Sequence, residues 1–197
     1  MGKKLATRDI IKILQNGGVG VLPTDTLYGL SASVFKPEAV EKIYKLKNKD
    51  PQKPLIILIS AVEDLAKLGI TLNENWQKVL AKIWPGPVSV VLPCKPNGLP
   101  HLHRGTNTLA CRLPAKPDLI DLLKQVGPLI STSANPTGKP PASTIAAAKK
   151  YFGDQVDFYL DGGTLSGAPS TLISLVNNKV EILRQGEINI DFGNIVL

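Results

Sequence analysis

The sequence predicts an α/β fold built on a mixed sheet, because short apolar runs alternate with amphipathic helical patterns along most of the chain. The run Leu55–Ile59 reads LIILI, a continuous apolar segment typical of a strand buried on both faces. Near the end of the chain, the runs Ser170–Val176 and Lys179–Leu183 flank Asn177-Asn178, a pair typical of a hairpin turn. An antiparallel hairpin beside interleaved strands and helices predicts a mixed sheet and not a purely parallel one.

The first part of the chain predicts two helices with a strand between them. Thr7 is expected to cap the first helix, and Gly17-Gly18 ends it. Val19–Leu22 is short and apolar, which predicts a strand that leads into the polar loop Pro23–Thr26. Pro37 fits the first position of the second helix, because its fixed φ and missing N–H are tolerated there.

The rest of the chain continues this alternation. The sequence WPGP at Trp84–Pro87 ends a helix, because proline cannot continue the backbone hydrogen bonding. Ser143 is a typical N-cap for the alanine-rich helix that follows it. In chain order, the expected elements are helices near Val62–Leu68 and Asn75–Trp84, a strand at Val88–Leu92, a polar excursion at Pro93–Asn107, a strand at Thr108–Arg112, a helix at Lys116–Val126, a strand at Leu129–Thr132, the helix after Ser143 and a strand at Val156–Leu160.

Composition narrows the classes of partner and compartment. Lys and Arg number 23 against 16 for Asp and Glu, so the formal charge is +7 and suits a nucleotide phosphate, a nucleic acid or a membrane surface. Cys94 and Cys111 are far apart in sequence, so we expect a reducing cytosol and neither a disulfide framework nor a zinc site. The N-terminus does not resemble a signal peptide, and the length predicts one domain spanning residues 1–197.

Several well-known signatures are missing from the sequence. It contains no GxxxxGK[ST] motif, and Gly17-Gly18-Val19-Gly20 precedes its strand and fails the dinucleotide-binding fingerprint. His101-Leu102-His103 has no HExxH pattern or nearby carboxylate, so we expect a surface loop there and no metal site. Aromatic residues make up 5% of the chain without an aromatic-rich run, which argues against single-stranded RNA readout.

Four polar loops adjoin predicted strands, and ligands of open α/β sheets bind at strand ends. The loops are PTDT, KLKNKDPQK, ACRLP and STSAN, and we expect them to converge on one pocket. Lys47 follows Val40 and Ile43 at i+7 and i+4, which places it on the apolar face of its helix. Either Lys47 complements the helix dipole at the C-terminus or its ammonium points into an anion pocket, together with Lys49 and Lys53.

The loop after Leu129 is unusually rich in hydroxyl groups. Ser131, Thr132, Ser133 and Asn135 offer neutral donors and acceptors, and the prolines that follow stiffen the chain. This loop is either an ordinary capped turn or part of an anion site at a helix N-terminus. Arg112 at the end of its strand is likewise either a structural partner for a carboxylate or a bidentate ligand for a substrate carboxylate or phosphate.

The motifs of these loops recur together in one known family. They are PTDTLYGL (23–30), the lysine segment 47–55, WPGPVSVVLP (84–93), CRLP (111–114), STSANPTGKPPAS (131–143), PSTLI (169–173) and LRQG (183–186). From Thr7 to Gly186 the chain resembles the YrdC/TsaC family, the threonylcarbamoyl-AMP synthases, in their single-domain form. The resemblance implies a twisted mixed sheet flanked by helices around a large basic cavity. It also implies a reaction in which L-threonine, bicarbonate or CO2, and ATP give threonylcarbamoyl-AMP and pyrophosphate.

The resemblance further implies roles for individual residues. Lys47, Lys49, Ser133 and Asn135 would be catalytic and would bind the ATP phosphates. Thr26, Leu58, Arg112 and Ser170 would form the threonine site, with Arg112 on the carboxylate. Lys53, Thr108, Ser143 and Arg184 would add contacts to ATP. The protein itself would ligate no metal, and Mg²⁺ would enter with ATP.

Two positions depart from the family pattern, and the resemblance leaves alternatives to compare. Lys49 stands where the family has an arginine, and Ser174 where many relatives have an aspartate. The product would serve threonylcarbamoyladenosine formation at position 37 of tRNA in the cytoplasm, with tRNA and the threonylcarbamoyl-transferase machinery as further partners and no membrane. One alternative is a module that binds structured RNA or tRNA without turnover, with steeply salt-dependent affinity. Another is a carbamoyl-transfer domain related to hydrogenase maturation, against which the missing zinc-finger and acylphosphatase segments argue.

Overall fold

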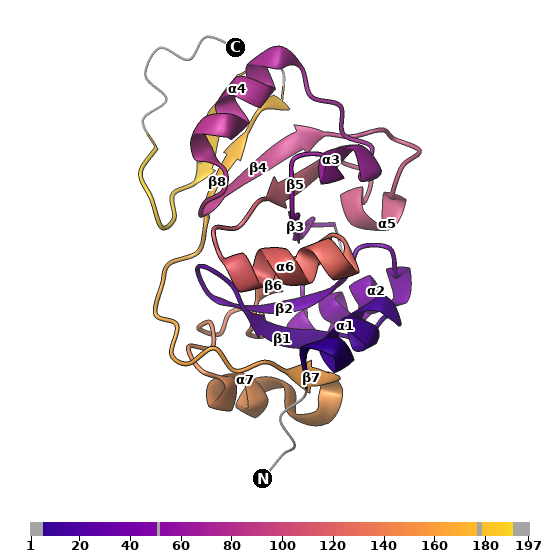
Figure 1. Ribbon diagram of the computed structural model, residues 1–197, viewed down its shortest axis with the longest axis vertical. Coiled ribbons are helices and arrows are strands. Elements are labelled where there is room, and N and C mark those ends of the chain that lie inside the picture. Colours follow the sequence, from indigo (N-terminus) through magenta and orange to yellow (C-terminus); the bar gives the residue numbers. More distant parts are fainter. Residues whose placement is uncertain (1–5, 51, 177–178, 191–197) are drawn as a thin grey trace.

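The computed structural model describes residues 6–50, 52–176 and 179–190. In these residues nine strands form one sheet in the order β7-β1-β2-β6-β3-β5-β4-β8-β9. Strand β3 pairs in parallel with β5 and antiparallel with β6, and β4 pairs in parallel with β8 and antiparallel with β5. The sheet is therefore mixed and flanked by helices, as the alternating sequence pattern predicts (Figure 1).

The elements follow the expected order along the chain. The helices are α1 (Thr7–Gln15), α2 (Pro37–Lys47), α3 (Asp64–Lys67), α4 (Glu74–Ile83), α5 (Pro100–His103), α6 (Pro117–Val126) and α7 (Ile145–Phe152), with a 3₁₀ turn at Gly153–Gln155. The strands are β1 (Gly20–Pro23), β2 (Tyr28–Ser33), β3 (Ile56–Leu58), β4 (Val88–Pro93), β5 (Thr108–Arg112), β6 (Leu129–Ser133), β7 (Phe158–Tyr159), β8 (Thr171–Ser174) and β9 (Glu181–Arg184).

Strand β2 is absent from the sequence-based expectation. Its sequence YGLSAS contains glycine and two serines, which dilute the apolar signal, yet all six residues are buried. The strand lies between β1 and β6 and pairs antiparallel with both, so neighbours cover both of its edges. The predicted polar loop Pro23–Thr26 consequently consists of the last residue of β1, which pairs with Tyr28, and most of the bend of the β1–β2 hairpin.

Helices bury apolar residues against both faces of the sheet. On one face α1 and α6 pack together, and Figure 1 shows α6 lying across the strands. Their buried cluster comprises Ile10, Leu14, Leu22, Leu58, Leu119, Leu122, Leu123, Val126, Leu129 and Phe158. A larger cluster contains the inner residues of α2, α4 and α7 together with most of the strands. Burial of this apolar surface is the main force that holds the loops at the strand ends in place.

Two helix starts differ by one residue from the predicted N-caps. The N-cap of α1 is Ala6 and not Thr7, and no side chain caps this end. The N-cap of α7 is Thr144 and not Ser143, because Thr144 has the extended backbone of a cap and its Oγ1 accepts from the N–H of Ala147 (3.2 Å). Ser143 lies just outside the helix, where its carbonyl accepts from the N–H of Leu165 (2.8 Å).

The predicted surface loop at His101-Leu102-His103 is wrong, because these residues form helix α5 and bury Leu102 and His103. The Nδ1 atom of His103 accepts from the N–H of Gly105 (3.1 Å), so its Nε2 carries the proton and donates to the carbonyl of Pro96 (3.0 Å). The histidine is thus satisfied inside the fold. The predicted turn at Asn177-Asn178 lies outside the described residues, although β8 and β9 do pair antiparallel.

No helix in the described part of the chain is long and apolar enough to cross a membrane.

Gly20 allows the close approach of β7 to β1, because a Cβ atom at this position would overlap the ring of Phe158. We therefore expect Gly20→Ala to lower the free energy of unfolding by about 1–3 kcal/mol through overpacking. In a Phe158→Ala background the overlap is removed, so the same substitution will cost clearly less. Urea unfolding of the four variants of this cycle measures the difference, and equal costs in both backgrounds would contradict the packing.

Candidate active site

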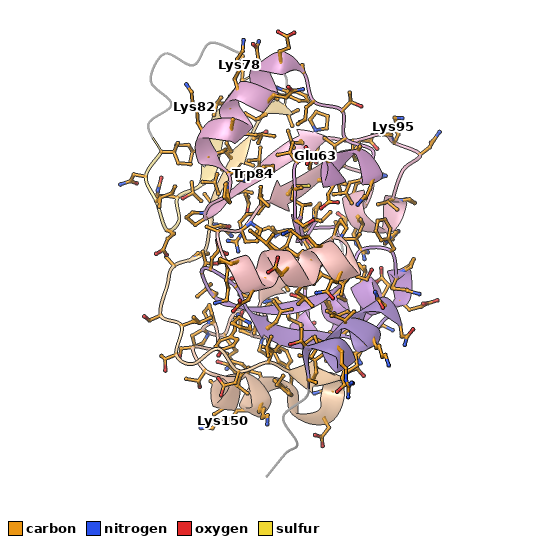
Figure 2. All side chains as sticks on the ribbon, in the orientation of Figure 1. Glu63, Lys78, Lys82, Trp84, Lys95 and Lys150 are labelled. Atoms are coloured by element: carbon orange, nitrogen blue, oxygen red, sulfur yellow. The ribbon has the colours of Figure 1, made fainter. Side chains whose placement is uncertain are left out.

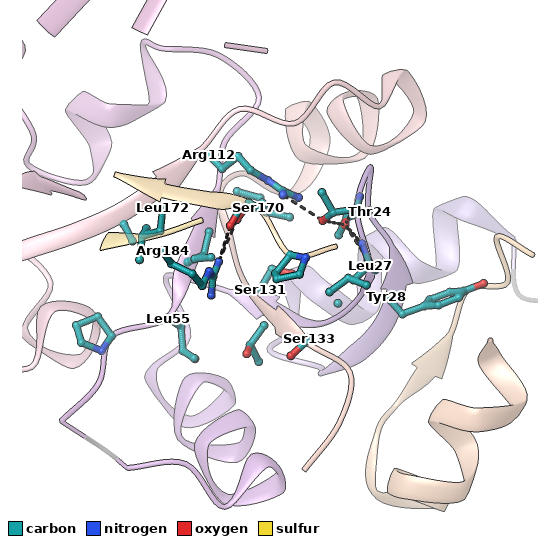
Figure 3. A pocket seen from close by; sticks show the side chains of 18 of the residues that line it. Thr24, Leu27, Tyr28, Leu55, Arg112, Ser131, Ser133, Ser170, Leu172 and Arg184 are labelled. Atoms are coloured by element: carbon teal, nitrogen blue, oxygen red, sulfur yellow. Dashed lines mark hydrogen bonds between the residues drawn. The ribbon is translucent and has the colours of Figure 1, made fainter. Parts of the chain in front are cut away.

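The predicted convergence of loops is present as a cavity of about 240 Å³ at the ends of the central strands (Figure 3). All four predicted loops contribute to its wall, since it includes Thr26, Lys49, Arg112 and Ser133. The segment that enters β8 and the end of β9 also contribute. The complete lining comprises Thr24, Thr26, Leu27, Tyr28, Gly29, Lys49, Pro54, Leu55, Ile56, Leu58, Ala110, Arg112, Ser131, Thr132, Ser133, Pro169, Ser170, Leu172 and Arg184.

Arg112 has the structural role that the sequence offers as one alternative, and it also faces the cavity. Its Nη2 donates to Oδ1 of Asp25 at 2.7 Å, so it is the structural partner of a carboxylate. Its Nη1 donates to Oγ1 of Thr26 at 3.1 Å, and the side chain also lines the cavity. Burial lowers the pKa of Arg112 and Asp25 opposes that shift. The guanidinium is therefore held in one orientation by protein groups while it faces the cavity.

The Pro23–Thr26 loop is shaped by the hydroxyl group of Thr24. Its Oγ1 donates to the carbonyl of Leu27 (2.7 Å) and accepts from the N–H groups of Thr26 and Leu27, each at 3.1 Å. Such side-chain bonds to nearby backbone take the place of strand pairing in the bend. They fix the backbone of Thr26 and with it the hydroxyl that Arg112 contacts.

Lys47 is buried, as its spacing from Val40 and Ile43 predicts, but its ammonium group does not line the cavity. Its Nζ donates to the carbonyl of Ser133 (2.7 Å), to Oγ of Ser133 (3.3 Å) and to Oδ1 of Asn135 (3.1 Å). Burial, and next the charge of Lys49, lower the pKa of Lys47 to about 8. The ammonium group therefore connects α2 to the loop after β6, directly behind the cavity wall.

Asn135 extends this connection. Its Nδ2 donates to the carbonyls of Pro136 (3.0 Å) and Lys139 (2.6 Å), while Oδ1 accepts from Lys47. The amide orientation follows from these partners, since carbonyl groups accept and an ammonium group donates. The side chain thereby closes the proline-rich loop on itself, which supports the predicted role of a stiff loop and places Ser133 at the cavity.

Lys49 and Arg184 supply the other cations of the cavity. Nη2 of Arg184 donates to the carbonyl (2.8 Å) and Oγ (3.4 Å) of Ser170, and the hydroxyl groups of Ser170 and Ser89 are 2.8 Å apart. In Figure 3 a dashed line joins Arg184 to Ser170, whereas the guanidinium of Arg112 points toward the bend that contains Thr24. Burial lowers the pKa of both Lys49 and Arg184, and for Lys49 the charges of Lys53 and Arg184 add to this effect. The cations are thus close enough to repel one another, which an anionic ligand would relieve.

The other residues singled out from the sequence lie away from the cavity wall. Lys53 is exposed, and its carbonyl accepts from Oη of Tyr44 (2.9 Å). Thr108 shares a face of β5 with Arg112 but lies four residues away, where its hydroxyl donates to Oγ1 of Thr106 (3.1 Å). Ser143 is exposed before α7. Ser174, the second departure from the family pattern, accepts from the N–H of Val176 (3.2 Å) and shapes the end of β8.

Two further observations concern other classes of site. No group of three or more His, Cys, Asp or Glu side chains arranged to hold a metal ion is found among the described residues. A larger depression of about 520 Å³ lies between α3 and α4, and Glu63 is the single charged residue among those that line it. The smaller cavity at the strand ends therefore has the chemistry of a site for an anionic ligand.

Comparisons with known proteins find relatives over most of the chain. The family model Sua5_yciO_yrdC, described as "Telomere recombination", matches residues 12–186. A threonylcarbamoyl-AMP synthase of Pseudomonas fluorescens is 35% identical over 85% of this chain and 91% of its own length. One of Bacillus subtilis is 33% identical over 89% of this chain, but the chain spans only 52% of that relative. The crystal structure of P. abyssi Sua5 complexed with L-threonine superposes with a TM-score of 0.85 at 30% identity, over 91% of this chain and 54% of that one.

The pKa of Lys47 makes stability depend on pH. In the unfolded chain this lysine keeps its proton up to its ordinary pKa of 10.5, whereas in the folded protein it loses it near 8. Between these values the unfolded state binds more protons, so the contribution of Lys47 to the free energy of unfolding increases with pH. We expect wild type to gain stability relative to Lys47→Met from pH 8 to 10. Chemical denaturation at each pH measures this difference, Lys45→Met on the exposed side of α2 is the control, and a constant difference would refute it.

Proposed function

Because this chain belongs to the Sua5/YciO/YrdC family, we propose that it is a threonylcarbamoyl-AMP synthase, an enzyme of the nucleotidyltransferase type. It would join L-threonine, bicarbonate or CO2, and ATP into threonylcarbamoyl-AMP and pyrophosphate. The observation that best supports this proposal is the cavity itself, in which Arg112, Lys49 and Arg184 surround one space beside a hydroxyl-lined loop. Its near full-length match to the Pseudomonas relative supports it as well.

At one end of the cavity we place the amino acid. The guanidinium of Arg112 suits a carboxylate, because it presents planar pairs of N–H donors. Thr26 fixes the guanidinium and Leu58 completes this part of the wall, while Ser170, which accepts from Arg184, lies where the two parts of the cavity meet. The complex of P. abyssi Sua5 with L-threonine supports this choice of amino acid.

At the other end we place the phosphates of ATP. Lys49 and Arg184 would neutralise them, and Ser133 would donate a hydrogen bond. Lys47 and Asn135 would act from behind by holding Ser133 at the wall. For Lys53, Thr108 and Ser143 we propose contacts with the part of ATP that extends beyond the cavity.

The chemistry requires no covalent enzyme intermediate. The neutral threonine amine attacks CO2 and releases one proton, which gives a carbamate. A carbamate oxygen then attacks the α-phosphorus of ATP, and pyrophosphate leaves. The residues bind, orient and neutralise charge, which is the usual protein contribution to phosphoryl-group chemistry.

Mg²⁺ is the proposed cofactor, and it would arrive with ATP. Mg²⁺ prefers octahedral oxygen ligands and is often held mainly by substrate phosphates and water. No carboxylate is among the described residues that line the cavity, so the phosphates and water would supply most of its ligands. When bound it would neutralise charge on the phosphates and the leaving pyrophosphate.

We further propose that the product serves threonylcarbamoyladenosine formation in tRNA and that the protein is cytoplasmic. The free thiols of Cys94 and Cys111 support a reducing compartment. The alternative of RNA binding without turnover would require basic residues gathered on one surface. Figure 2 instead shows labelled exposed lysines at opposite ends of the molecule, Lys78 and Lys82 on α4 and Lys150 on α7. The buried position of Lys47 also favours a pocket.

The decisive experiment withholds each substrate in turn. We expect pyrophosphate release when L-threonine, bicarbonate and ATP with Mg²⁺ are all present, and threonylcarbamoyl-AMP in the mass spectrum of the same mixture. Lys47→Ala will lower kcat at least roughly 100-fold, because it leaves the acceptors of the buried Asn135 and the half-buried Ser133 without their charged donor. Lys45→Ala, on the exposed side of the same helix, is the matched control. Pyrophosphate release that persists without threonine would refute the proposed reaction.

Lys49 offers a second test, because the resemblance places an arginine at this position. A guanidinium keeps the charge and adds a planar pair of donors for phosphate oxygens. We therefore expect Lys49→Arg to lower KM for ATP roughly three- to tenfold, with KM for threonine unchanged. Lys45→Arg, at an exposed position on helix α2 to which no ligand contact is assigned, should leave both constants as they are in wild type. An unchanged or weaker affinity for ATP would contradict this prediction and would show that the cavity does not accommodate a guanidinium group in contact with the phosphates.

A further inference from the structure

Asp25 is a partly buried carboxylate to which the proposed reaction assigns no role. It belongs to the bend of the β1–β2 hairpin, its side chain is 11% exposed, and it does not line the cavity. Its Oδ1 accepts from Nη2 of Arg112 at 2.7 Å, and its Oδ2 accepts from the N–H of Ala115 at 3.1 Å. Both oxygens are thus bound to the segment that contains Arg112, so the carboxylate is fixed relative to the guanidinium.

The contacts of Arg112 leave donors free for a ligand. A guanidinium has five N–H donors, of which Asp25 and Thr26 each engage one. Among the described residues, no group accepts from its buried Nε. An unmatched buried donor is costly, which indicates that a ligand or water supplies the missing acceptor. The guanidinium of Arg112 is therefore held in one orientation by two of its N–H donors, while other donors remain free to bind a ligand.

The three cations of the cavity differ in how their charge is balanced. Arg112 has a carboxylate oxygen within 4.0 Å, and its side chain is 5% exposed. No ion pair of Lys49 or Arg184 is found in the described part of the chain. Arg184 is linked to the neutral Ser170 instead. Asp25 therefore offsets part of the positive charge at Arg112, although the charge of Arg184 also acts there, while Lys49 and Arg184 have no such ion-pair partner among the described residues.

We propose that Asp25 is a positioning residue that also determines ligand choice: by balancing the charge of Arg112, it reserves this end of the cavity for the carboxylate of a zwitterionic amino acid and directs phosphate groups to Lys49 and Arg184. Without Asp25 the buried guanidinium would attract any anion, because a buried charge without a counter-ion is energetically costly. The N–H donors that remain can still recognise a planar carboxylate. This inference rests on the proposed function for the identity of the two ligands.

Inorganic phosphate is the probe that tests this division of the cavity. In wild type we expect phosphate to compete with ATP but not with L-threonine, as measured by titration calorimetry of each ligand at several phosphate concentrations. In Asp25→Asn we expect phosphate to compete with threonine as well, and the affinity for threonine to fall roughly 10- to 100-fold as the guanidinium loses its charged anchor. The affinity for ATP should change little. Asp121→Asn, which alters an exposed carboxylate on α6, is the matched control.

The outcomes separate this proposal from the proposed function. Competition between phosphate and threonine in wild type would overturn the division directly, without any variant. A lower threonine affinity in Asp25→Asn without new competition from phosphate would show that Asp25 only supports the structure. That result would also overturn the proposed role in ligand choice. If wild type binds no threonine, the proposed function fails, and the charge-balancing role is then decided by whether Asp25→Asn binds one phosphate more per chain than wild type. Circular dichroism of the variant verifies its fold.

Discussion

The arrangement of the candidate site depends on the buried ammonium group of Lys47. A charge that is removed from water must find acceptors, and here they are the carbonyl and hydroxyl of Ser133 and the amide oxygen of Asn135. These bonds connect the end of helix α2 to the loop after strand β6, two segments separated by 86 residues in sequence. The apolar face of α2 is buried in the core, so the position of this helix is fixed by packing. The hydrogen bonds of Lys47 therefore fix the loop relative to the helix.

The strand order makes this loop part of a cavity. Strands β2, β6, β3 and β5 are consecutive neighbours in the sheet, and the loops or residues at their ends bring Thr26, Ser133, Lys49 and Arg112 around one space. Strand β8 joins through β4 and adds Ser170, while β9 adds Arg184. A site made of groups on six separate elements requires the whole sheet to be formed, so folding and ligand recognition are coupled in this protein.

Local sequence patterns predicted the parts of this arrangement that depend on period and composition. The spacing of Val40, Ile43 and Lys47 predicted that the lysine lies on the apolar face of its helix but left its partners open, and LIILI predicted strand β3. Strand β2 was not predictable in this way, because YGLSAS owes its burial to neighbours that lie far away in sequence. The same applies to Asp25, since nothing in the polar loop PTDT specifies an arginine 87 residues later. Ser170 and Arg184 were predicted through the family resemblance alone, because the pairing of β8 with β4 and β9 is a tertiary event.

The cations of this site illustrate three ways in which a protein can hold positive charge away from water. Lys47 donates to neutral oxygens, Arg112 donates to a carboxylate and a hydroxyl but has no acceptor for its Nε, and Lys49 and Arg184 form no ion pair among the described residues. The first arrangement gives rigidity, since every donor of the ammonium has a partner. The second gives orientation with donors to spare, and the third gives attraction for anions. A reaction that brings a carboxylate and a polyphosphate together needs all three at once. Under the proposed function, these different arrangements of four cationic side chains would let one cavity hold a carboxylate and a polyphosphate side by side.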